Sequence, residues 1–299
     1  MNTSNDPLQP VWPFDIGIVG LGIVGAHQLT REAEEVIRRC KRTYVIESGY
    51  GIVEYLETIS PNVKSLAGLY EPGKSRLPTY RKMAAEVIAG ALEETPVCLA
   101  AYGHPWVYCY PTTLINYAAP LLDLKVEVFP GISSFDTLLV DLGTDIAFNG
   151  MQMYEATDLL LRKRPIQNDV TCVIWQATIV GDPTYPENRP KEAEFKPLEA
   201  HLLRFYPADH EITLVMTKTF PLLRSVVQRF PLRSLARELA RAPQVGTLYI
   251  KAVDTRPIED AELLKRMVAM EGNSKPAKPK PKPKPSRPGR PEIGPRPKR

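Results

Sequence analysis

The sequence predicts an α/β protein with two lobes, a cofactor cleft between them and a disordered C-terminal tail. Short apolar runs alternate with segments whose apolar residues recur at helical spacing, a pattern typical of a largely parallel sheet with helices on its faces. Hydrophobic residues make up 43% of the 299 residues, which is ample for a sizeable core. Pro130-Gly-Ile-Ser-Ser134 interrupts the pattern. We therefore expect an irregular lead-in at 1–14, lobes at 15–132 and 133–271, and the tail at 272–299.

The spacing of apolar residues divides each lobe into strands and helices. Pro78 lies in the first turn of an amphipathic segment, where the missing N–H of proline costs nothing. In the first lobe we expect strands at 15–20, 43–47, 96–102 and 125–129 and helices at 28–41, 78–94 and 112–122. In the second lobe we expect strands at 169–176, 211–218 and 245–252 and helices at 197–206 and 258–270.

The tail is strongly basic and rich in proline. Residues 273–299 contain ten Lys or Arg and one Glu, so a chain with a net charge of +4 has a tail of +9 and a body of −5. Lys or Arg alternates with Pro from Lys275 to Lys284, and proline at this density prevents helix and central strand. We expect an extended, mobile segment outside the catalytic fold.

Composition excludes several classes of protein. No apolar segment approaches the roughly 20 residues that span a bilayer, and the N-terminus lacks the pattern of a secretory signal. The four cysteines are far apart without Cys-x-x-Cys spacing, so we expect neither a disulfide framework nor a metal site. These features predict a cytoplasmic protein without membrane attachment.

A glycine-rich turn follows the first predicted strand. Gly20-Leu-Gly22-Ile-Val-Gly25 precedes a predicted helix, which is the context of a nucleotide-binding turn whose glycines let a ligand approach backbone N–H groups. Glu47, 22 residues beyond Gly25, has the spacing of an acid that binds a ribose, so a dinucleotide is not excluded. The alternative interpretation is a tight turn whose glycines serve packing alone.

Two segments carry side chains suited to acid–base chemistry. Tyr70-Glu-Pro-Gly-Lys-Ser-Arg76-Leu-Pro-Thr-Tyr80 places two phenols and a guanidinium within eleven residues. A tyrosine beside a cation has a lowered pKa and can take a proton from a weak acid while the arginine stabilises the anion. The alternative is a solvated helix start with an ordinary stacking contact. In Tyr102-Gly-His104-Pro, His104 is either a base or, as we favour, a residue that shapes the loop or contacts a ligand.

Several segments, in the same order, resemble the tetrapyrrole methylase superfamily and, within it, the borosin peptide backbone α-N-methyltransferases. The matching segments are GKSRLPTY (Gly73–Tyr80), YGHP (Tyr102–Pro105), PGISS (Pro130–Ser134), YEATDLLLRKRP (Tyr154–Pro165), WQ (Trp175-Gln176), YPADHE (Tyr206–Glu211) and GTLYI (Gly246–Ile250). Motifs in the right order are more specific than any one of them. The resemblance implies two α/β lobes that bind S-adenosylmethionine and transfer its methyl group.

The resemblance also implies roles for individual residues. The positions that hold S-adenosylmethionine are matched by Tyr102, His104, Val107, Ser134, Gln176, Thr217, Gly246 and Thr247, to which we add Gly20 and Gly22 of the glycine-rich turn. The catalytic group is matched by Tyr70, Arg76 and Tyr80. The lone pair of an amide nitrogen is delocalised into the carbonyl, so the nitrogen must lose its proton as the methyl arrives. We therefore expect Tyr80 to be the base, Arg76 an electrostatic stabiliser and Tyr70 a positioning donor.

The chain departs from the borosin pattern in two places. Trp106 follows YGHP where the family usually has Gly, so the indole is expected to narrow the pocket or line a peptide groove. Fused members carry a helical clasp and an apolar core peptide at the C-terminus, whereas Ile293 is the only large apolar residue after Ala277. This difference predicts a split enzyme that acts in trans on a separate precursor peptide, with a homodimer expected by analogy.

Two other functions stay open at this level. One is a methylase of the same superfamily that modifies a tetrapyrrole or another small acceptor, although a tetrapyrrole carbon is already nucleophilic and needs no Tyr/Arg/Tyr group. The other is an inactive scaffold that binds acidic partners through the basic tail. Nucleic acid would bind only non-specifically, through that tail.

Overall fold

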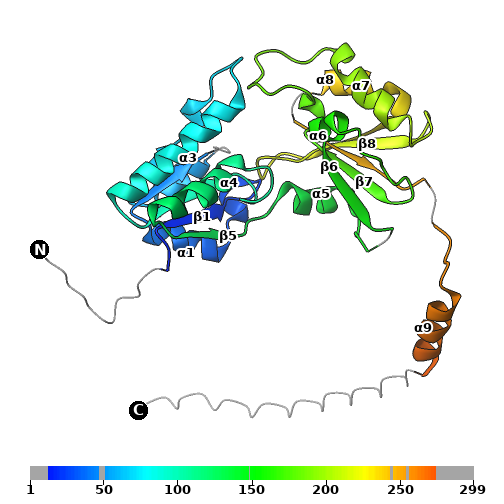
Figure 1. Cartoon of the computed structure of the whole chain (residues 1–299), viewed down its shortest axis with the longest axis horizontal. Coiled ribbons are helices and arrows are strands. Elements are labelled where there is room, and N and C mark those ends of the chain that lie inside the picture. Colours follow the sequence, from blue (N-terminus) through cyan, green and yellow to red (C-terminus); the bar gives the residue numbers. More distant parts are fainter. Residues whose placement is uncertain (1–12, 47–50, 148, 243–244, 254–255, 274–299) are drawn as a thin grey trace, which may run out of the picture. The chain divides into compact units, whose positions relative to one another are not determined.

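The computed structural model describes residues 13–46, 51–147, 149–242, 245–253 and 256–273 (Figure 1). Most of the predicted lead-in, the tail beyond residue 273 and Glu47 lie outside the described residues. The chain divides into two compact units, one up to residue 255 and one from residue 256. The first unit holds both sheets, and the second holds helix α9 (Ala261–Asn273). Among the described residues, no helix is long and apolar enough to cross a bilayer.

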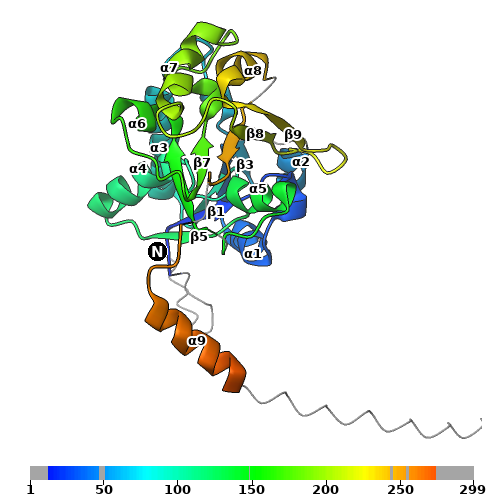
Figure 2. The ribbon, with the colours of Figure 1, turned by 90° about the vertical axis from the view of Figure 1, so that its right-hand side faces the viewer.

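Five parallel strands form the first sheet, in the order β3-β2-β4-β1-β5. Their bounds are β1 Ile16–Gly20, β2 Arg42–Val45, β3 Val63–Ser65, β4 Val97–Ala101 and β5 Val126–Phe129. Because side chains alternate along a strand, Cys98 and Ala100 pack toward α1 and α2 on one face, and Leu99 and Ala101 toward α3 and α4 on the other (Figure 2). These helices are α1 Arg31–Arg39, α2 Ile52–Glu57, α3 Arg76–Glu93 and α4 Tyr110–Ala118.

The second sheet is mixed, in the order β6-β7-β10-β8-β9. Its strands are β6 Met151–Glu155, β7 Thr171–Trp175, β8 Glu211–Met216, β9 Val226–Pro231 and β10 Thr247–Ile250. Helix α5 (Ser134–Leu142) packs on one face, and α6 (Ala156–Leu161), α7 (Glu192–Leu202) and α8 (Leu235–Arg241) pack on the other. Short 3-10 turns lie at Gly25–Gln28, Ala67–Leu69, Ala119–Leu122, Ala177–Ile179 and Leu232–Ser234.

The predicted two-lobe α/β class is confirmed, but the prediction of a largely parallel sheet is wrong for the second lobe. There, only β6 and β7 pair in parallel, and the other three pairs are antiparallel. Strand β8 reaches β9 through a loop without a crossover helix, and strands joined this way can pair only in antiparallel fashion.

One predicted helix begins in the wrong place. The sequence predicted a helix that begins at Pro197, whereas α7 begins at Glu192 and contains Pro197 in its interior. The helix start is set by acidic residues in its first turn and by the side chain of Glu194, whose Oε2 accepts a hydrogen bond of 2.7 Å from the Lys191 N–H. Pro197 is the sixth of the eleven residues of α7, so it removes one backbone hydrogen bond in the middle of the helix.

Candidate active site

Three glycines bring the carboxyl ends of the first-lobe strands close together. A Cβ atom on Gly20 would lie 2.5 Å from the carbonyl oxygen of Gly103 and 2.6 Å from Cα of Gly131. Gly103 also pairs with Gly22, donating its N–H to the Gly22 oxygen at 2.9 Å. The loops after β1, β4 and β5 therefore cross with backbone against backbone, and this crossing fixes where their side chains enter the cleft.

The glycine-rich turn has its own internal hydrogen bonds. The side-chain oxygen of Gln28 accepts the N–H groups of Ile23 at 2.7 Å and Val24 at 2.9 Å. Gly22 has a φ of +73°, and a Cβ there would meet the Gln28 side chain. The N–H groups of Ile23 and Val24 are therefore already hydrogen-bonded and are not available to a phosphate. The geometry favours a turn whose glycines serve packing over a dinucleotide-binding turn. From this turn, Ile23 reaches the wall of the pocket described next.

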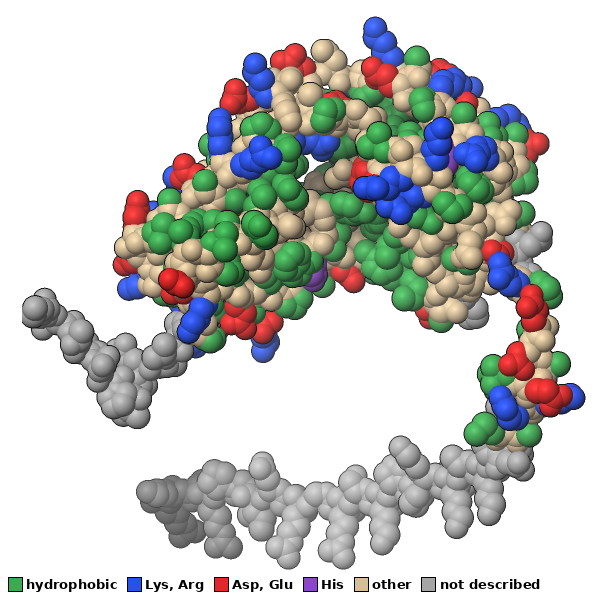
Figure 3. Space-filling view, in the orientation of Figure 1, with side chains coloured by type: hydrophobic (Ala, Val, Ile, Leu, Met, Phe, Trp, Pro, Cys, Tyr) green, Lys and Arg blue, Asp and Glu red, His purple; other side chains and the backbone are tan. Residues whose placement is uncertain are grey.

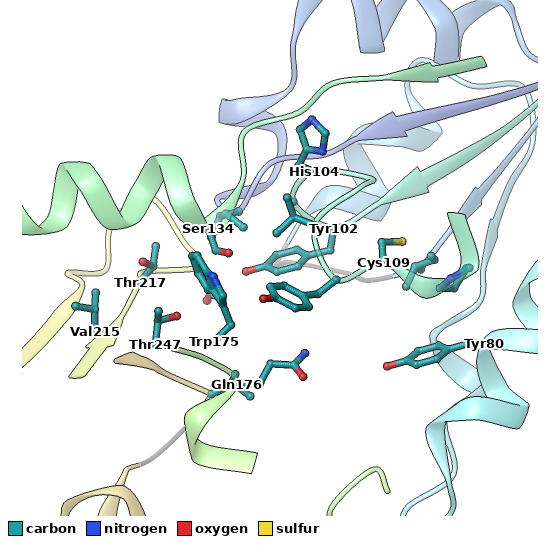
Figure 4. Close-up of a pocket in the computed structure, with 18 of the residues that line it drawn as sticks. Tyr80, Tyr102, His104, Cys109, Ser134, Trp175, Gln176, Val215, Thr217 and Thr247 are labelled. Atoms are coloured by element: carbon teal, nitrogen blue, oxygen red, sulfur yellow. The ribbon is translucent and has the colours of Figure 1, made fainter. Parts of the chain in front are cut away.

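A cavity of about 560 Å³ lies between the two lobes (Figures 3 and 4). The first lobe contributes Ile23, Ile46, Tyr70, Tyr80, Tyr102, Gly103, His104, Val107, Tyr108, Cys109 and Pro111. The second lobe contributes Ser134, Trp175, Gln176, Val215, Thr217, Thr219, Val245 and Thr247. Figure 4 shows Ser134, Thr217 and Thr247 at one end, Tyr80 at the other and Gln176 between them. The cavity thus joins a hydroxyl-rich end to a tyrosine end.

The hydroxyl-rich end is built on a well-capped helix. Ser133 caps α5 by accepting the N–H of Phe135 at 3.1 Å, and Asp136 accepts the Ser133 N–H at 2.7 Å in return. Ser134 is consequently the first helical residue and faces the cavity. Thr217 donates its hydroxyl to a carboxylate oxygen of Asp141 at 2.7 Å. The cap fixes the backbone at Ser134, and the bond to Asp141 fixes the Thr217 hydroxyl.

Some of the other residues expected to bind the cofactor line the cavity, and the rest lie behind its wall. Tyr102, His104, Val107, Gln176 and Thr247 line the cavity together with Ser134 and Thr217, whereas Gly20, Gly22 and Gly246 are not among the lining residues. The Gly246 N–H donates to the Thr178 hydroxyl at 3.0 Å, and a Cβ at this position would lie 2.6 Å from Leu214. The structure therefore gives these glycines a supporting position behind the wall.

His104 and Trp106 belong to one tight loop. The Trp106 N–H donates to Nδ1 of His104 at 3.1 Å, a contact that shapes the turn. The Trp106 side chain is 53% exposed and is not among the residues that line the cavity. The Trp106 indole is therefore not part of the cavity wall, and the expectation that it narrows the pocket is not met.

The tyrosine end brings together two of the three residues expected to be catalytic. The rings of Tyr70 and Tyr80 both line the cavity and meet edge to face with centroids 6.3 Å apart. Tyr110 packs on Tyr80 in the same way, also at 6.3 Å. Arg76, at the first position of α3, is not a lining residue. Its Nη2 donates to the carbonyl oxygen of Asp182 in the second lobe at 2.6 Å.

Tyr108 is a lining residue that the sequence analysis did not single out. Its φ of +55° is rare for a residue with a side chain, and its ring lies 6.0 Å from that of Trp175 across the cleft. Burial raises the pKa of its phenol, which therefore stays protonated and can act as a donor. Its place directly after the Tyr102–Val107 segment was the available signal, but a tyrosine with positive φ leaves no trace in the sequence.

Comparison with known proteins agrees with this geometry. The sequence profile of the tetrapyrrole (corrin/porphyrin) methylases matches residues 15–177. A methyltransferase and cyclic peptide precursor for gymnopeptides from Gymnopus fusipes is 28% identical over 235 residues, covering 78% of this chain and 56% of the relative. A type I borosin cyclic peptide precursor with methyltransferase from Coprinopsis marcescibilis is 31% identical over 221 residues, covering 73% and 56%. The chain spans about half the length of the curated relatives it matches.

Solved structures share the fold at low sequence identity. Uroporphyrin-III-C-methyltransferase from Thermus thermophilus superimposes with a TM-score of 0.58 at 19% identity, over 80% of this chain and 93% of that one. A structure of uroporphyrin-III C-methyl transferase from the same organism, complexed with S-adenyl homocysteine, gives a TM-score of 0.54 at 16% identity, over 80% and 92%. Because the family profile covers more than half of the sequence and both lobes have this architecture, the chain belongs to the tetrapyrrole (corrin/porphyrin) methylase family.

Proposed function

We propose that this chain is an S-adenosylmethionine-dependent methyltransferase that methylates backbone amides of a peptide. The observation that carries the proposal is the single cavity in which a hydroxyl-rich end continues into a pair of tyrosines, Tyr70 and Tyr80. The proposal is supported by the resemblance to relatives named as methyltransferases fused to cyclic peptide precursors.

The cavity fits a cofactor of this kind. Its volume of about 560 Å³ lies within the roughly 300–1,000 Å³ usual for small-molecule sites. Ser134, Thr217 and Thr247 supply hydroxyls for a polar ligand. Apolar side chains of Ile23, Val107 and others complete the wall. When bound there, S-adenosylmethionine supplies an electrophilic methyl group.

The tyrosine end would then handle the acceptor. An amide nitrogen is a poor nucleophile because its lone pair is delocalised into the carbonyl, so the proton must leave as the new N–C bond forms. In this proposal Tyr80 acts as its phenolate and would take that proton to become the neutral phenol, and the Tyr70 hydroxyl would donate to the amide oxygen. In this proposal Arg76, which lies outside the cavity wall and is oriented by the carbonyl oxygens of Asp182 and Pro183, acts through its positive charge and not by direct contact with the acceptor.

We propose further that the acceptor is a separate precursor peptide and that the enzyme works as a homodimer. Within this sequence, residues 274–299 contain Ile293 as their only large apolar residue, so these residues themselves are not proposed as the acceptor. For the dimer, exposed apolar side chains gather over α3, α4 and the turn after α4 (Figure 3), where Tyr117 is 77% and Leu121 75% exposed. A second copy of the chain would cover such a face.

The test is a peptide methylation assay. Purified protein, S-adenosylmethionine and candidate precursor peptides are incubated, and the intact mass of each peptide is measured. The proposal predicts mass gains of whole methyl groups that are lost in Tyr80→Phe and retained in Leu161→Ala, a control at an 80% exposed side chain at the end of α6 that does not line the cavity. Binding of the cofactor without methylation of any peptide would contradict the peptide acceptor and favour a small-molecule acceptor. Absence of cofactor binding would contradict the enzyme itself.

A further inference from the structure

A short two-stranded pairing joins the lobes next to the tyrosine end. Residues 73–76 of the first lobe run antiparallel to residues 182–185 of the second, and we call these two segments the inter-lobe clamp. Its backbone contacts are Gly73 N–H to Tyr185 O (2.8 Å), Tyr185 N–H to Lys74 O (2.9 Å) and Arg76 N–H to Pro183 O (3.0 Å), with Ser75 and Thr184 as the bridge pair. Outside the polypeptide link between β5 and α5, this clamp is a second tie between the lobes.

Side chains lock the clamp at both edges. The Arg76 guanidinium donates to the Asp182 carbonyl oxygen at 2.6 Å, a charge-assisted bond. The Asp182 carboxylate accepts both the N–H of Thr184 at 2.8 Å and its hydroxyl at 2.7 Å, so the second-lobe segment is already shaped to receive its partner. Gly73 has a φ of +71°, a conformation that favours glycine, and a Cβ there would lie 3.2 Å from the Glu187 carboxylate.

The second-lobe segment of the clamp ends at Tyr185, whose ring contacts a tyrosine of the candidate site. Tyr185 stacks on Tyr70 with centroids 5.1 Å apart and an interplanar angle of 27°. The Tyr70 ring also packs edge to face against Tyr80. Tyr70 is therefore held between a ring of the second lobe and a ring of α3. Tyr185 itself is not among the residues that line the cavity, so any influence on the acceptor must pass through Tyr70.

The clamp makes little contribution to the cores of the lobes. Residues 71–75 are all exposed, and Tyr185 is 44% exposed. Exposed hydrogen bonds and one half-exposed ring pair stabilise a fold far less than buried apolar side chains do. What the contacts do fix is the position of the loop that carries Tyr70 relative to the second lobe.

We propose that Tyr185 is a positioning residue for the acceptor site, holding Tyr70 and, through it, the edge of Tyr80 in place by way of the inter-lobe clamp. The inference rests on the proposed function, because it states how the groups that meet the acceptor amide are aligned. It assigns a role to a second-lobe residue outside all of the motifs that identified the site.

The test compares Tyr185→Ala with Tyr185→Phe, which keeps the stacked ring, and with Leu161→Ala, at an exposed position on α6, as a control. Three quantities are measured: kcat and KM for a methylated peptide, the affinity for S-adenosylhomocysteine, and hydrogen exchange of residues 66–80 without acceptor. We expect Tyr185→Ala to lower kcat about tenfold, equivalent to about 1.4 kcal/mol, which one aromatic pair can supply. Its cofactor affinity should be unchanged, exchange at residues 66–80 should be faster, and Tyr185→Phe should stay within about twofold of the wild type.

Two results would overturn the inference. Equal kcat values for Tyr185→Ala and Tyr185→Phe would remove any role for the stacked ring. Faster exchange throughout the protein together with weaker cofactor binding would assign Tyr185 a general structural role. If the wild-type protein methylates no peptide, the proposed function fails, but the exchange measurement still decides whether Tyr185 orders residues 66–80.

Discussion

The crossing of three glycines behind the cavity allows a sharp test of how the site is built. The perturbation is Gly20→Ala, which adds a Cβ 2.5 Å from the Gly103 oxygen and 2.6 Å from Gly131 Cα. Ordinary contacts of this kind are about 3.5–4.0 Å, so the overlap is about 1 Å against backbone on two sides. Neither neighbour is the end of a flexible side chain, so the strands themselves must move.

The expected loss of stability is large for one methyl group. Overpacking of this kind costs about 1–3 kcal/mol, which exceeds the roughly 0.4–1 kcal/mol that replacing glycine gains through the unfolded chain. Gly68→Ala is the matched control, because its Cβ meets nothing within 4 Å and its backbone is not left-handed. Urea denaturation without ligand should show a lower free energy of unfolding for Gly20→Ala, and an unchanged or slightly higher one for Gly68→Ala.

The same variant separates packing from ligand approach. If the loops after β1, β4 and β5 shift, calorimetry should also show weaker binding of S-adenosylhomocysteine. A Gly20→Ala protein with wild-type stability that has lost only its ligand affinity would refute the packing argument, because it would mean that Gly20 makes room for ligand rather than for Gly103 and Gly131.

Three further predictions follow from particular contacts. Arg76→Lys should lower kcat for methyl transfer while leaving cofactor affinity unchanged in calorimetry, because a lysine cannot reproduce the planar fork that meets the Asp182 and Pro183 carbonyls; a wild-type kcat would count against this. Ser133→Ala should lower the free energy of unfolding by about 0.5–2 kcal/mol in urea denaturation, through loss of the α5 cap; no change would show that the cap is dispensable. Burial lowers the pKa of His201, so the folded state binds fewer protons than the unfolded one, and the free energy of unfolding should fall as the pH drops below about 6.5. In denaturation curves His201→Gln should lose part of this pH dependence. The same pH dependence in His201→Gln as in the wild type would contradict the assignment to His201.

The sequence was sufficient to predict the strands whose apolar residues are buried on both faces of a sheet. Strands such as β1 and β4 are continuous apolar runs, and both were predicted within a residue or two. Strand β6 was missed because none of its five residues is fully buried, so it lacks a clear apolar pattern. The antiparallel half of the second sheet depends on how loops return the chain, which spacing along the sequence does not reveal.

The site was partly predictable for the same reason. Nine of the residues that the resemblance implied line one cavity, most of them at or just beyond the end of a strand. The position of Arg76 could not be predicted, because its partner carbonyls lie more than 100 residues away, in a segment that no motif marks. Tyr185 was not predicted for the same reason, because its contact with Tyr70 forms only when the two lobes come together.

The most direct test of the account is to locate the methyl group on the product. A peptide methylated with deuterium-labelled S-adenosylmethionine is fragmented in a mass spectrometer, and the label is assigned to a backbone nitrogen or to a side chain. The account predicts label on backbone nitrogens of a peptide supplied in trans, with no label when Tyr80 is replaced by Phe. Label on a side chain or a small molecule, or full labelling by Tyr80→Phe, would contradict it.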